Sequence, residues 1–257
     1  MNTFFNRLYR LLFCRGGHGV HSPFVFDLIT TVIEEQRHYY CYKQIHSVRL
    51  QLLQDQQKVM LRNRLMSIKK AIATDCFTES EDRLLFRLSN RFRPKTIYVE
   101  GSRFGLTPLY LTSYAKDSAC IVIEPEPTIA VVAREQLKKY AWASVEIYSE
   151  AIALPPQLDF IVWGASFHTN KSGASALLSD EKRNEKALTM ANFERFLSSI
   201  GEHSIMVITG INASIANKKV WNALCTHSKV TVTFDFYRFG IVFFNPRYHQ
   251  KTYKTIV

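Results

Sequence analysis

The sequence has no continuous apolar run of about 18 residues, so we expect no transmembrane helix. Its aromatic opening is interrupted by Arg7 and Arg10 and lacks a small-residue cleavage site, which argues against a signal peptide. Cysteine is scarce: there are 5, an odd number, and none forms a Cys-x-x-Cys pair. We therefore expect neither a disulfide framework nor a zinc site, and we predict a cytoplasmic location.

Acidic residues are the minority charge, with 22 Asp and Glu against 33 Lys and Arg and a net charge of +11. The excess lies mainly in residues 1–95, which carry 16 basic and 8 acidic side chains. Such a basic region suits a nucleic acid, an anionic membrane surface or an acidic substrate. A solvated basic face is the simpler interpretation. The hydrophobic share of 47% excludes a disordered chain.

The first third of the chain has the apolar spacing of helices, over residues 4–12 and 24–33. Ser22 and Pro23 mark a helix start, with serine as the N-cap and proline at the first helical position. Residues 46–73 are basic and predict a further helix. Residues 80–91 predict another, with Ser80 as its cap.

From Pro94 onwards, short β-branched runs alternate with helical segments. We expect strands at 96–100, 120–124, 145–148, 159–163 and 204–209, helices at 106–115, 127–140, 188–200 and 215–227, and a hairpin of 230–236 with 240–244. This alternation predicts an α/β, Rossmann-like, seven-stranded, mostly parallel sheet with an antiparallel C-terminal hairpin strand, plus N-terminal helices. We expect two domains: a helical arm or lid over 1–93 and a ligand-binding domain over 94–257.

A short glycine loop, residues 100–105, joins the first strand to its helix. Glycines there allow a tight turn and a close approach of backbone to ligand. Glu124 ends the next strand, where an acid accepts ribose hydroxyls. No Gly-Lys-Ser/Thr follows and the pattern Gly-x-Gly-x-x-Gly is incomplete, which disfavours a P-loop and NAD. S-adenosylmethionine (SAM) is the nucleoside ligand that fits best; a plain βα turn with a helix-capping acid is the alternative.

Three segments resemble one family. GHGVHSPFVF (17–26) is similar to the HGxHSPF signature of a bacterial subgroup, PKTIYVEGSRFGLTPLYLTSYA (94–115) to a strand-and-glycine-loop segment, and TVTFDFYRFGIVFF (231–244) to a C-terminal hairpin. Together they resemble the bacterial class I SAM-dependent methyltransferases, near the small-molecule O-methyltransferases. The resemblance implies the class I methyltransferase fold and methyl transfer from SAM.

The resemblance also implies roles for particular residues. The loop would wrap the methionine end of SAM, Glu124 would bind the ribose, Glu150 would accept the adenine amino group, and residues 46–73 would cover the site as part of a lid. Trp163 would stack on adenine or fill the core. The expected cofactor-binding residues are Glu100, Gly101, Ser102, Phe104, Gly105, Glu124, Ser149, Glu150, Ala151 and Trp163.

The sequence departs from the family where a divalent metal would be held. The family's carboxylates at the ends of strands four and five align with Gly164 and with Thr209-Gly210. Without paired carboxylates we expect no metal. The candidates for a catalytic role near the strand ends are His168, Asn212 and Tyr237. His18 and His21 are candidates for substrate contacts; the alternative is that they cap the second helix and pack the N-terminal arm.

Three functions therefore stay open. The first is a metal-independent SAM-dependent methyltransferase acting on an unidentified small molecule. The second is a pseudoenzyme that keeps the fold for binding or assembly, as the lost acids suggest. The third is an RNA-directed methyltransferase or binder, suggested by the basic first third and its tyrosines at 39, 40 and 42. A homodimer is a further expectation.

Overall fold

The computed structural model of the chain describes residues 20–61, 64–141, 143–164 and 188–256. The chain forms two compact units. Unit 1 comprises residues 1–151 and 254–257, and unit 2 comprises residues 152–253. The helix expected at 4–12 lies outside the described residues.

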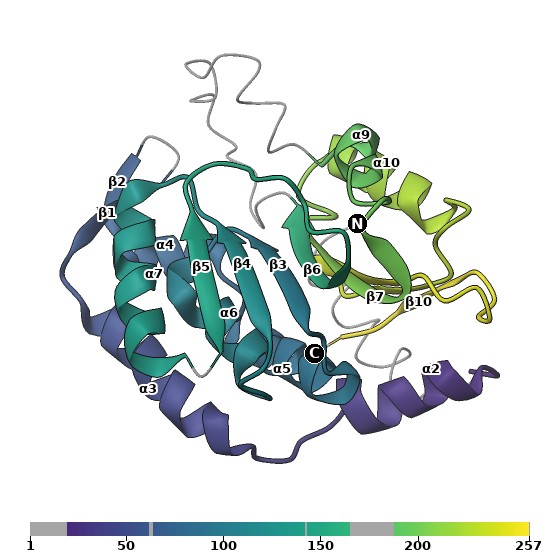
Figure 1. Cartoon of the computed structure of the whole chain (residues 1–257), viewed down its shortest axis with the longest axis horizontal. Coiled ribbons are helices and arrows are strands. Elements are labelled where there is room, and N and C mark those ends of the chain that lie inside the picture. The colour runs from purple at the N-terminus through teal and green to yellow at the C-terminus, as the bar shows by residue number, and fades with distance from the viewer. Residues whose placement is uncertain (1–19, 62–63, 142, 165–187, 257) are drawn as a thin grey trace. The chain divides into compact units, whose positions relative to one another are not determined.

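Unit 1 is built on three parallel strands in the order β3–β4–β5 (Figure 1). They are β3 (Thr96–Glu100), β4 (Ala119–Ile123) and β5 (Ser144–Tyr148). Each is a short run rich in β-branched residues, which suit a pleated and buried surface. The strands pair in register, so that Glu100 lies beside Ile123, and Ile123 beside Tyr148. Their carboxyl ends therefore meet at one edge, where the loops to the next helices begin.

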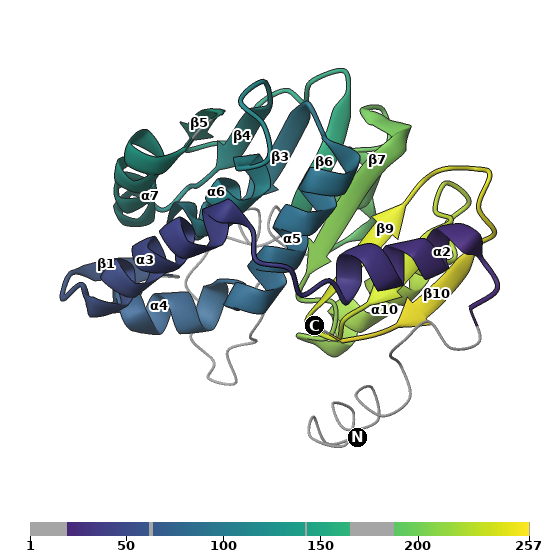
Figure 2. The same cartoon turned by 90° about the horizontal axis from the view of Figure 1, so that it is seen from below.

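Helices α5 (Glu79–Phe92) and α6 (Leu106–Thr112) lie beneath these strands in Figure 2, and α7 (Pro127–Tyr140) follows β4. The predicted helix at 80–91 is confirmed, but its cap is Thr78 rather than Ser80. The Thr78 hydroxyl accepts from the Glu81 N–H, and the Glu81 carboxylate accepts from the Thr78 N–H, which is a capping box. The helix ends at Arg93, whose φ of 50° is left-handed.

The N-terminal part of unit 1 contains α2 (Pro23–Leu28), a π-helical turn η1 (Ile29–Ile33), α3 (Tyr40–Gln54) and α4 (Ile68–Asp75). Ser22 caps α2 and Pro23 opens it, as predicted. The single helix expected at 46–73 is wrong. An antiparallel hairpin of β1 (Lys58–Leu61) and β2 (Arg64–Ser67) separates α3 from α4.

A buried polar cluster joins three of these helices. Arg49 of α3 donates to Oδ2 of Asp82 on α5 at 2.6 Å, and the Thr107 hydroxyl of α6 donates to Oδ1 at 2.8 Å. Asp82 is fully buried, and the loss of solvation raises the pKa of its carboxyl to about 7 against the opposing effect of Arg49. The cluster fixes how α3, α5 and α6 pack.

Unit 2 contains the remaining strands of the sheet. β6 (Leu158–Gly164) runs parallel to β7 (Ile200–Thr209), which pairs antiparallel with β9 (Phe239–Phe243). β8 (Val232–Asp235) pairs antiparallel with β9, and β10 (Lys251–Lys254) adds an edge strand that the sequence did not predict.

Two helices accompany these strands, α9 (Met190–Glu194) and α10 (Ile215–Cys225). α9 is shorter than the helix expected over 188–200, because turns replace helix after Glu194. α10 packs tightly on β9. A Cβ placed on Gly240 would lie 2.2 Å from the Trp221 ring, so only glycine fits there.

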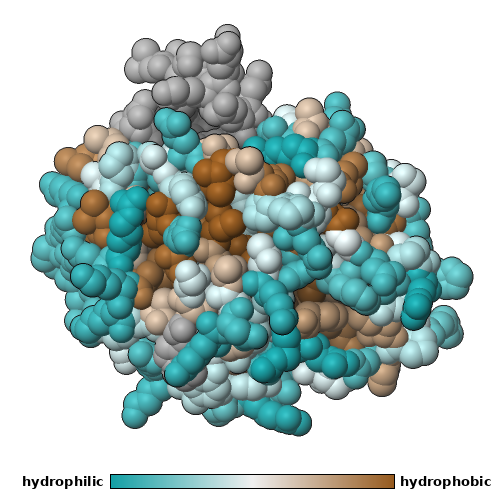
Figure 3. Space-filling model, in the orientation of Figure 1, coloured by the Kyte–Doolittle hydropathy of each residue, from teal (hydrophilic) through white to brown (hydrophobic). Residues whose placement is uncertain are grey.

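These elements confirm the predicted fold class: an α/β, Rossmann-like fold with a mostly parallel sheet, antiparallel C-terminal strands and N-terminal helices. The core is dense in apolar residues such as Val99, Val122, Phe160 and Val207. In Figure 3, hydrophobic surface gathers over β4 and β5, and hydrophilic residues surround it. The expected boundary between 93 and 94 is untested and stays a prediction.

Two expectations from the sequence concern membrane-spanning helices and disulfide bonds. In the part of the chain that the structure describes, no helix is both long and apolar enough to cross a bilayer. Cys41, Cys76, Cys120 and Cys225 are all unbridged, and Cys14 lies outside the described residues. Burial raises the pKa of Cys41 and of Cys120 to about 12, so both thiols stay protonated.

Candidate functional site

The carboxyl-end edge of unit 1 brings the predicted glycine loop and the predicted acid together. After β3, the backbone turns through Gly101 at φ 81°, then through a short 3₁₀ turn η2 (Arg103–Gly105), and enters α6. Arg103 and Phe104 both have left-handed φ values, 47° and 60°, and Gly105 has 83°. Side-chain-bearing residues adopt such angles only where surrounding contacts impose them.

Glu124 imposes part of this geometry. Its Oε2 accepts from both the N–H and the hydroxyl of Ser102, each at 2.8 Å, and its Oε1 accepts from the Glu126 N–H at 3.1 Å. Both Glu124 and Ser102 are buried. Charge-assisted bonds of this kind are among the stronger ones in proteins. The acid at the end of β4 thus clamps the loop at the end of β3.

The two loop glycines have different roles. A Cβ on Gly105 would come within 3.3 Å of the Ala133 carbonyl oxygen and 3.4 Å of Leu137, so Gly105 lets the start of α6 approach α7. A Cβ on Gly101 would meet no backbone within 4 Å, only the Arg103 guanidinium. Gly101 is therefore the loop position that leaves room at the strand end. The Phe104 side chain is buried in the core.

Arg103 is a loop residue that sequence reasoning missed. Its Nη1 donates to the carbonyl oxygens of Glu100 and Gly101, both at 2.9 Å, and its guanidinium lies 5.1 Å from the centroid of the Phe77 ring. The side chain is 8% exposed. The position of Arg103 in the sequence could have indicated it, because an arginine between two loop glycines has to adopt the backbone angles that the turn requires.

The other predicted ligand contacts in unit 1 lie at the same strand edge. Glu100 ends β3 and is half-buried, and its carboxylate accepts from the Tyr98 hydroxyl at 3.4 Å. Ser149, Glu150 and Ala151 follow β5 and are exposed. Glu150 is therefore an exposed acid at the same edge of the strands as Glu124.

No family model matches the sequence, and no curated protein matches it. Solved structures do. Cofactor-bound Rv0187 from MTB is 12% identical with a TM-score of 0.54, over 86% of this chain and 94% of that one. The O-methyltransferase TomG from Streptomyces achromogenes, in complex with SAM, is 12% identical with a TM-score of 0.50, over 86% and 94%.

An O-methyltransferase from Bacillus cereus, in complex with S-adenosylhomocysteine (SAH), is 11% identical with a TM-score of 0.50, over 85% of this chain and 94% of that chain. The chain shares its fold with these three solved structures. Identities this low show the fold, and the chain's own residues have to carry any statement about its ligand.

In the described part of unit 2, β6 ends at Gly164 and β7 at Thr209, so neither of these two strands ends in an acid. Gly164 ends β6 with φ 127°, and a Cβ there would lie 2.7 Å from the carbonyl oxygen and 2.9 Å from the nitrogen of Thr209. No residue with a side chain fits at 164 without moving backbone. Within the described residues, no group of three or more His, Cys, Asp or Glu side chains is placed to hold a metal.

Two predicted catalytic candidates meet through the backbone. Asn212 Nδ2 donates to the Tyr237 carbonyl oxygen at 2.8 Å, and the Tyr237 N–H donates to Asp235 Oδ1 at 2.7 Å. Tyr237 has a left-handed φ of 72°. Asn212 and Asp235 thus stabilise the β8–β9 turn through two hydrogen bonds to the backbone of Tyr237. Asp235 was missed because it reads as an ordinary strand residue.

The remaining predicted residues are dispersed. Trp163 is 1% exposed and its ring lies 5.7 Å from that of Phe196, which places it in the core of unit 2. His21 is exposed just before α2. His18 and His168 lie outside the described residues.

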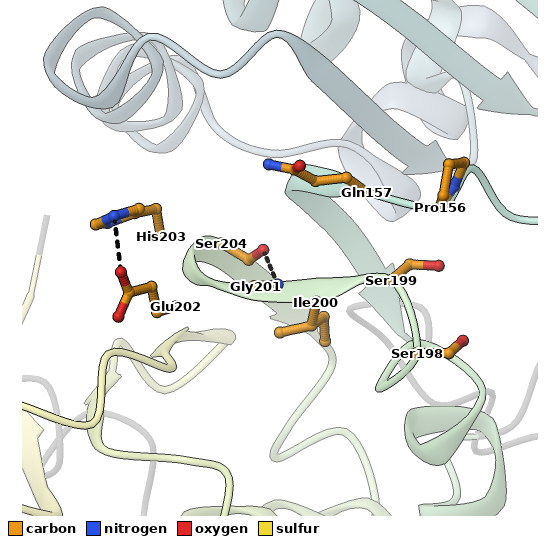
Figure 4. A pocket seen from close by; sticks show the side chains of 9 residues that line it. All are labelled: Pro156, Gln157, Ser198, Ser199, Ile200, Gly201, Glu202, His203 and Ser204. Carbon is orange, nitrogen blue, oxygen red and sulfur yellow. Dashed lines mark hydrogen bonds and ion pairs between the residues drawn. The ribbon is translucent and has the colours of Figure 1, made fainter.

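Unit 2 also has an open pocket of about 280 Å³, drawn in Figure 4. It lies where β6 and β7 begin, at the opposite end of β6 from Gly164, and its lining includes three serines (198, 199 and 204). Ser204 Oγ accepts from the Gly201 N–H at 2.9 Å, and His203 lies 3.2 Å from Glu202.

Proposed function

We propose that the carboxyl-end edge of unit 1 binds the adenosine part of SAM and that the protein is a methyltransferase acting on a small molecule without a metal. The observation that carries the proposal is the Glu124–Ser102 clamp. Glu124 directly follows β4, and its carboxylate is hydrogen-bonded to the glycine loop that follows β3. Open α/β sheets bind nucleosides at this edge, outside the carboxyl ends of the strands.

The described residues fit the nucleoside half of this ligand. The Glu124 carboxylate accepts from Ser102 and from the Glu126 N–H, which fixes it at the edge where the nucleoside would lie. Glu150 is exposed and adds an acceptor for an amino group along the same edge. At Gly101 the Arg103 guanidinium occupies the space that the missing side chain leaves, so the amino-acid half of the ligand would approach an arginine there.

When bound, SAM supplies an electrophilic methyl group on a sulfonium, and transfer needs in-line positioning of the acceptor. The chain's own residues would bind the ligand and orient it. Glu124 fixes the glycine loop, and the loop would in turn hold the ligand. Among the described residues, β6 and β7 end in Gly164 and Thr209, which offer no carboxylate, and this donor set supports transfer without a divalent cation.

The test is calorimetric titration with SAM and SAH, followed by a methyl-transfer assay against phenolic and other small acceptors. Saturable binding that Glu124→Ala weakens, with the fold intact by circular dichroism, supports the proposal. Binding that Glu124→Ala leaves unchanged would refute the placement of the ligand.

A second candidate is a non-catalytic protein that keeps the fold for binding or assembly. The contact of Gly164 with Thr209 favours it, because this contact closes the position where the related fold places an acid. Ligand binding without transfer to any acceptor would support this candidate over the first.

A third candidate is an RNA-directed methyltransferase or binder. Four basic residues are exposed on and beside the β1–β2 hairpin: Lys58, Arg64, Lys69 and Lys70. Such a group suits a phosphate backbone, and steeply salt-dependent retention on RNA would support it. A cytoplasmic location and a homodimer are part of the proposal and are tested by fractionation and by size-exclusion chromatography with light scattering.

A further inference from the structure

The Arg103 side chain folds back onto the loop that carries it. One nitrogen, Nη1, donates to the carbonyl oxygens of Glu100 and Gly101, both at 2.9 Å. The Phe77 ring lies 5.1 Å from the guanidinium carbon, a cation–π distance. The loop's two carbonyl acceptors at the end of β3 are thereby taken by the chain's own cation.

The guanidinium lies in the space that glycine leaves at position 101. A Cβ added there would meet Arg103 Nη1 at 3.7 Å and Arg103 Cζ at 3.9 Å, with no other atom within 4 Å. Glycine at the end of a strand normally lets a ligand approach the backbone. Here an arginine side chain occupies that approach.

The loop holds Arg103 in this place at a conformational cost. Arg103 and Phe104 are consecutive non-glycine residues with left-handed φ values of 47° and 60°. In the described structure, Arg103 Nε is buried and has no hydrogen-bond partner. The Ser102–Glu124 bonds and the buried Phe104 ring offset these costs. A built-in cation kept under strain points to a role beyond stability.

We propose that Arg103 is a specificity-determining residue that disfavours a ligand with an amino-acid tail at this loop. The proposal rests on the proposed function, in which adenosine lies against Glu124. SAM and SAH carry an amino-acid tail with an ammonium group and a carboxylate. At the loop the tail would have to displace the guanidinium from the place above Gly101, and its ammonium would meet a like charge and two carbonyl oxygens that already accept from Arg103. 5′-Methylthioadenosine has the same nucleoside and no amino-acid tail, so it escapes the penalty.

Two substitutions separate charge from space. Arg103→Ala removes the cation and empties the place above Gly101. Arg103→Met removes the cation and keeps an unbranched chain against Phe77, so it also serves if the alanine variant fails to fold. Arg37→Ala is the matched control, because the Arg37 side chain is 81% exposed and its loss makes the same change in net charge.

The experiment titrates each protein with SAH and with 5′-methylthioadenosine by calorimetry, with thermal unfolding as the check on folding. We expect the unaltered protein to bind 5′-methylthioadenosine at least as tightly as SAH. We expect Arg103→Ala to raise SAH affinity by about tenfold, with less than about a threefold change for 5′-methylthioadenosine. Arg103→Met gives a smaller gain in the same direction, and Arg37→Ala gives no change.

An unchanged ratio of the two affinities in both Arg103 variants would overturn the role of Arg103 and leave the proposed function standing. So would an unaltered protein that binds SAH far more tightly than 5′-methylthioadenosine. Failure of all four proteins to bind either ligand would overturn the proposed function and this inference with it.

Discussion

The carboxylate of Glu124 accepts two hydrogen bonds from Ser102, one from its backbone N–H and one from its hydroxyl, each 2.8 Å long. These bonds join the end of β4 to the loop after β3. A single pair of buried residues therefore sets the shape of the edge at which we place the ligand, and the pair's energetics can be measured.

Ser102→Ala removes the hydroxyl donor and leaves the backbone donor in place. We expect a loss of about 1–2 kcal/mol in the free energy of unfolding, because a buried carboxylate loses one partner. Urea unfolding measures it. The control is Ser47→Ala, whose exposed hydroxyl donates only to the Lys43 carbonyl. A Ser102→Ala variant as stable as this control would contradict the clamp.

Gly164→Ala tests the close contact between the ends of β6 and β7. A Cβ at 164 would lie 2.7 Å from the Thr209 carbonyl oxygen, on a backbone with φ 127°. We expect a loss of about 2–4 kcal/mol in the free energy of unfolding. Gly201→Ala is the matched control, since its Cβ would meet nothing nearer than Ser204 Oγ at 4.0 Å. Equal stability of the two variants would show that the backbone at 164 yields easily.

Asp82 predicts a pH dependence of stability. Burial raises the pKa of its carboxyl from 3.8 to about 7 in the folded chain, against the lowering effects of Arg49, Thr107 and Arg103. Between these two values the folded state binds more protons than the unfolded state. The free energy of unfolding therefore falls as pH rises from about 4 to about 7.

The measurement compares urea unfolding at pH 5 and pH 7.5 for the unaltered protein and for Asp82→Asn, which cannot ionise. We expect the unaltered protein to lose stability over this window relative to the variant. A relative gain would mean that the carboxylate is already ionised against Arg49 at pH 5.

Metal removal tests the chemistry at the strand ends of unit 2. If methyl transfer is found, we expect it to survive dialysis against EDTA and to show no stimulation by added Mg²⁺, because Gly164 and Thr209 supply no carboxylate. The assay compares initial rates before and after dialysis. A rate that disappears with EDTA and returns with Mg²⁺ would contradict a metal-independent reaction.

The sequence predicts the sheet of this protein well because its strands are short β-branched runs that lie between clear turns. The strand at 96–100 and the helix at 127–140 match β3 and α7 residue for residue. The glycine loop and Glu124 are also where the sequence places them, since a parallel sheet brings successive strand ends to one edge.

The failures have local causes. Residues 58–67 contain basic residues at helical spacing, and the turn that makes them a hairpin has no glycine or proline to signal it. Arg103 was missed because neither a left-handed φ nor a side chain folded back on its own loop leaves a trace in composition. Asp82 looks like a solvated acid in the first turn of α5, and only packing shows that it is buried.

The most direct test of the account is calorimetric titration of the unaltered protein and of Glu124→Gln with SAH and with 5′-methylthioadenosine. We predict saturable binding to the unaltered protein and at least about a tenfold loss in Glu124→Gln. A neutral amide there replaces the carboxylate that clamps Ser102 and that we propose as the acceptor for the ribose hydroxyls. Circular dichroism should show the same fold in both. Equal affinities in the two proteins, or no binding of either ligand to the unaltered protein, would contradict a nucleoside site at Glu124.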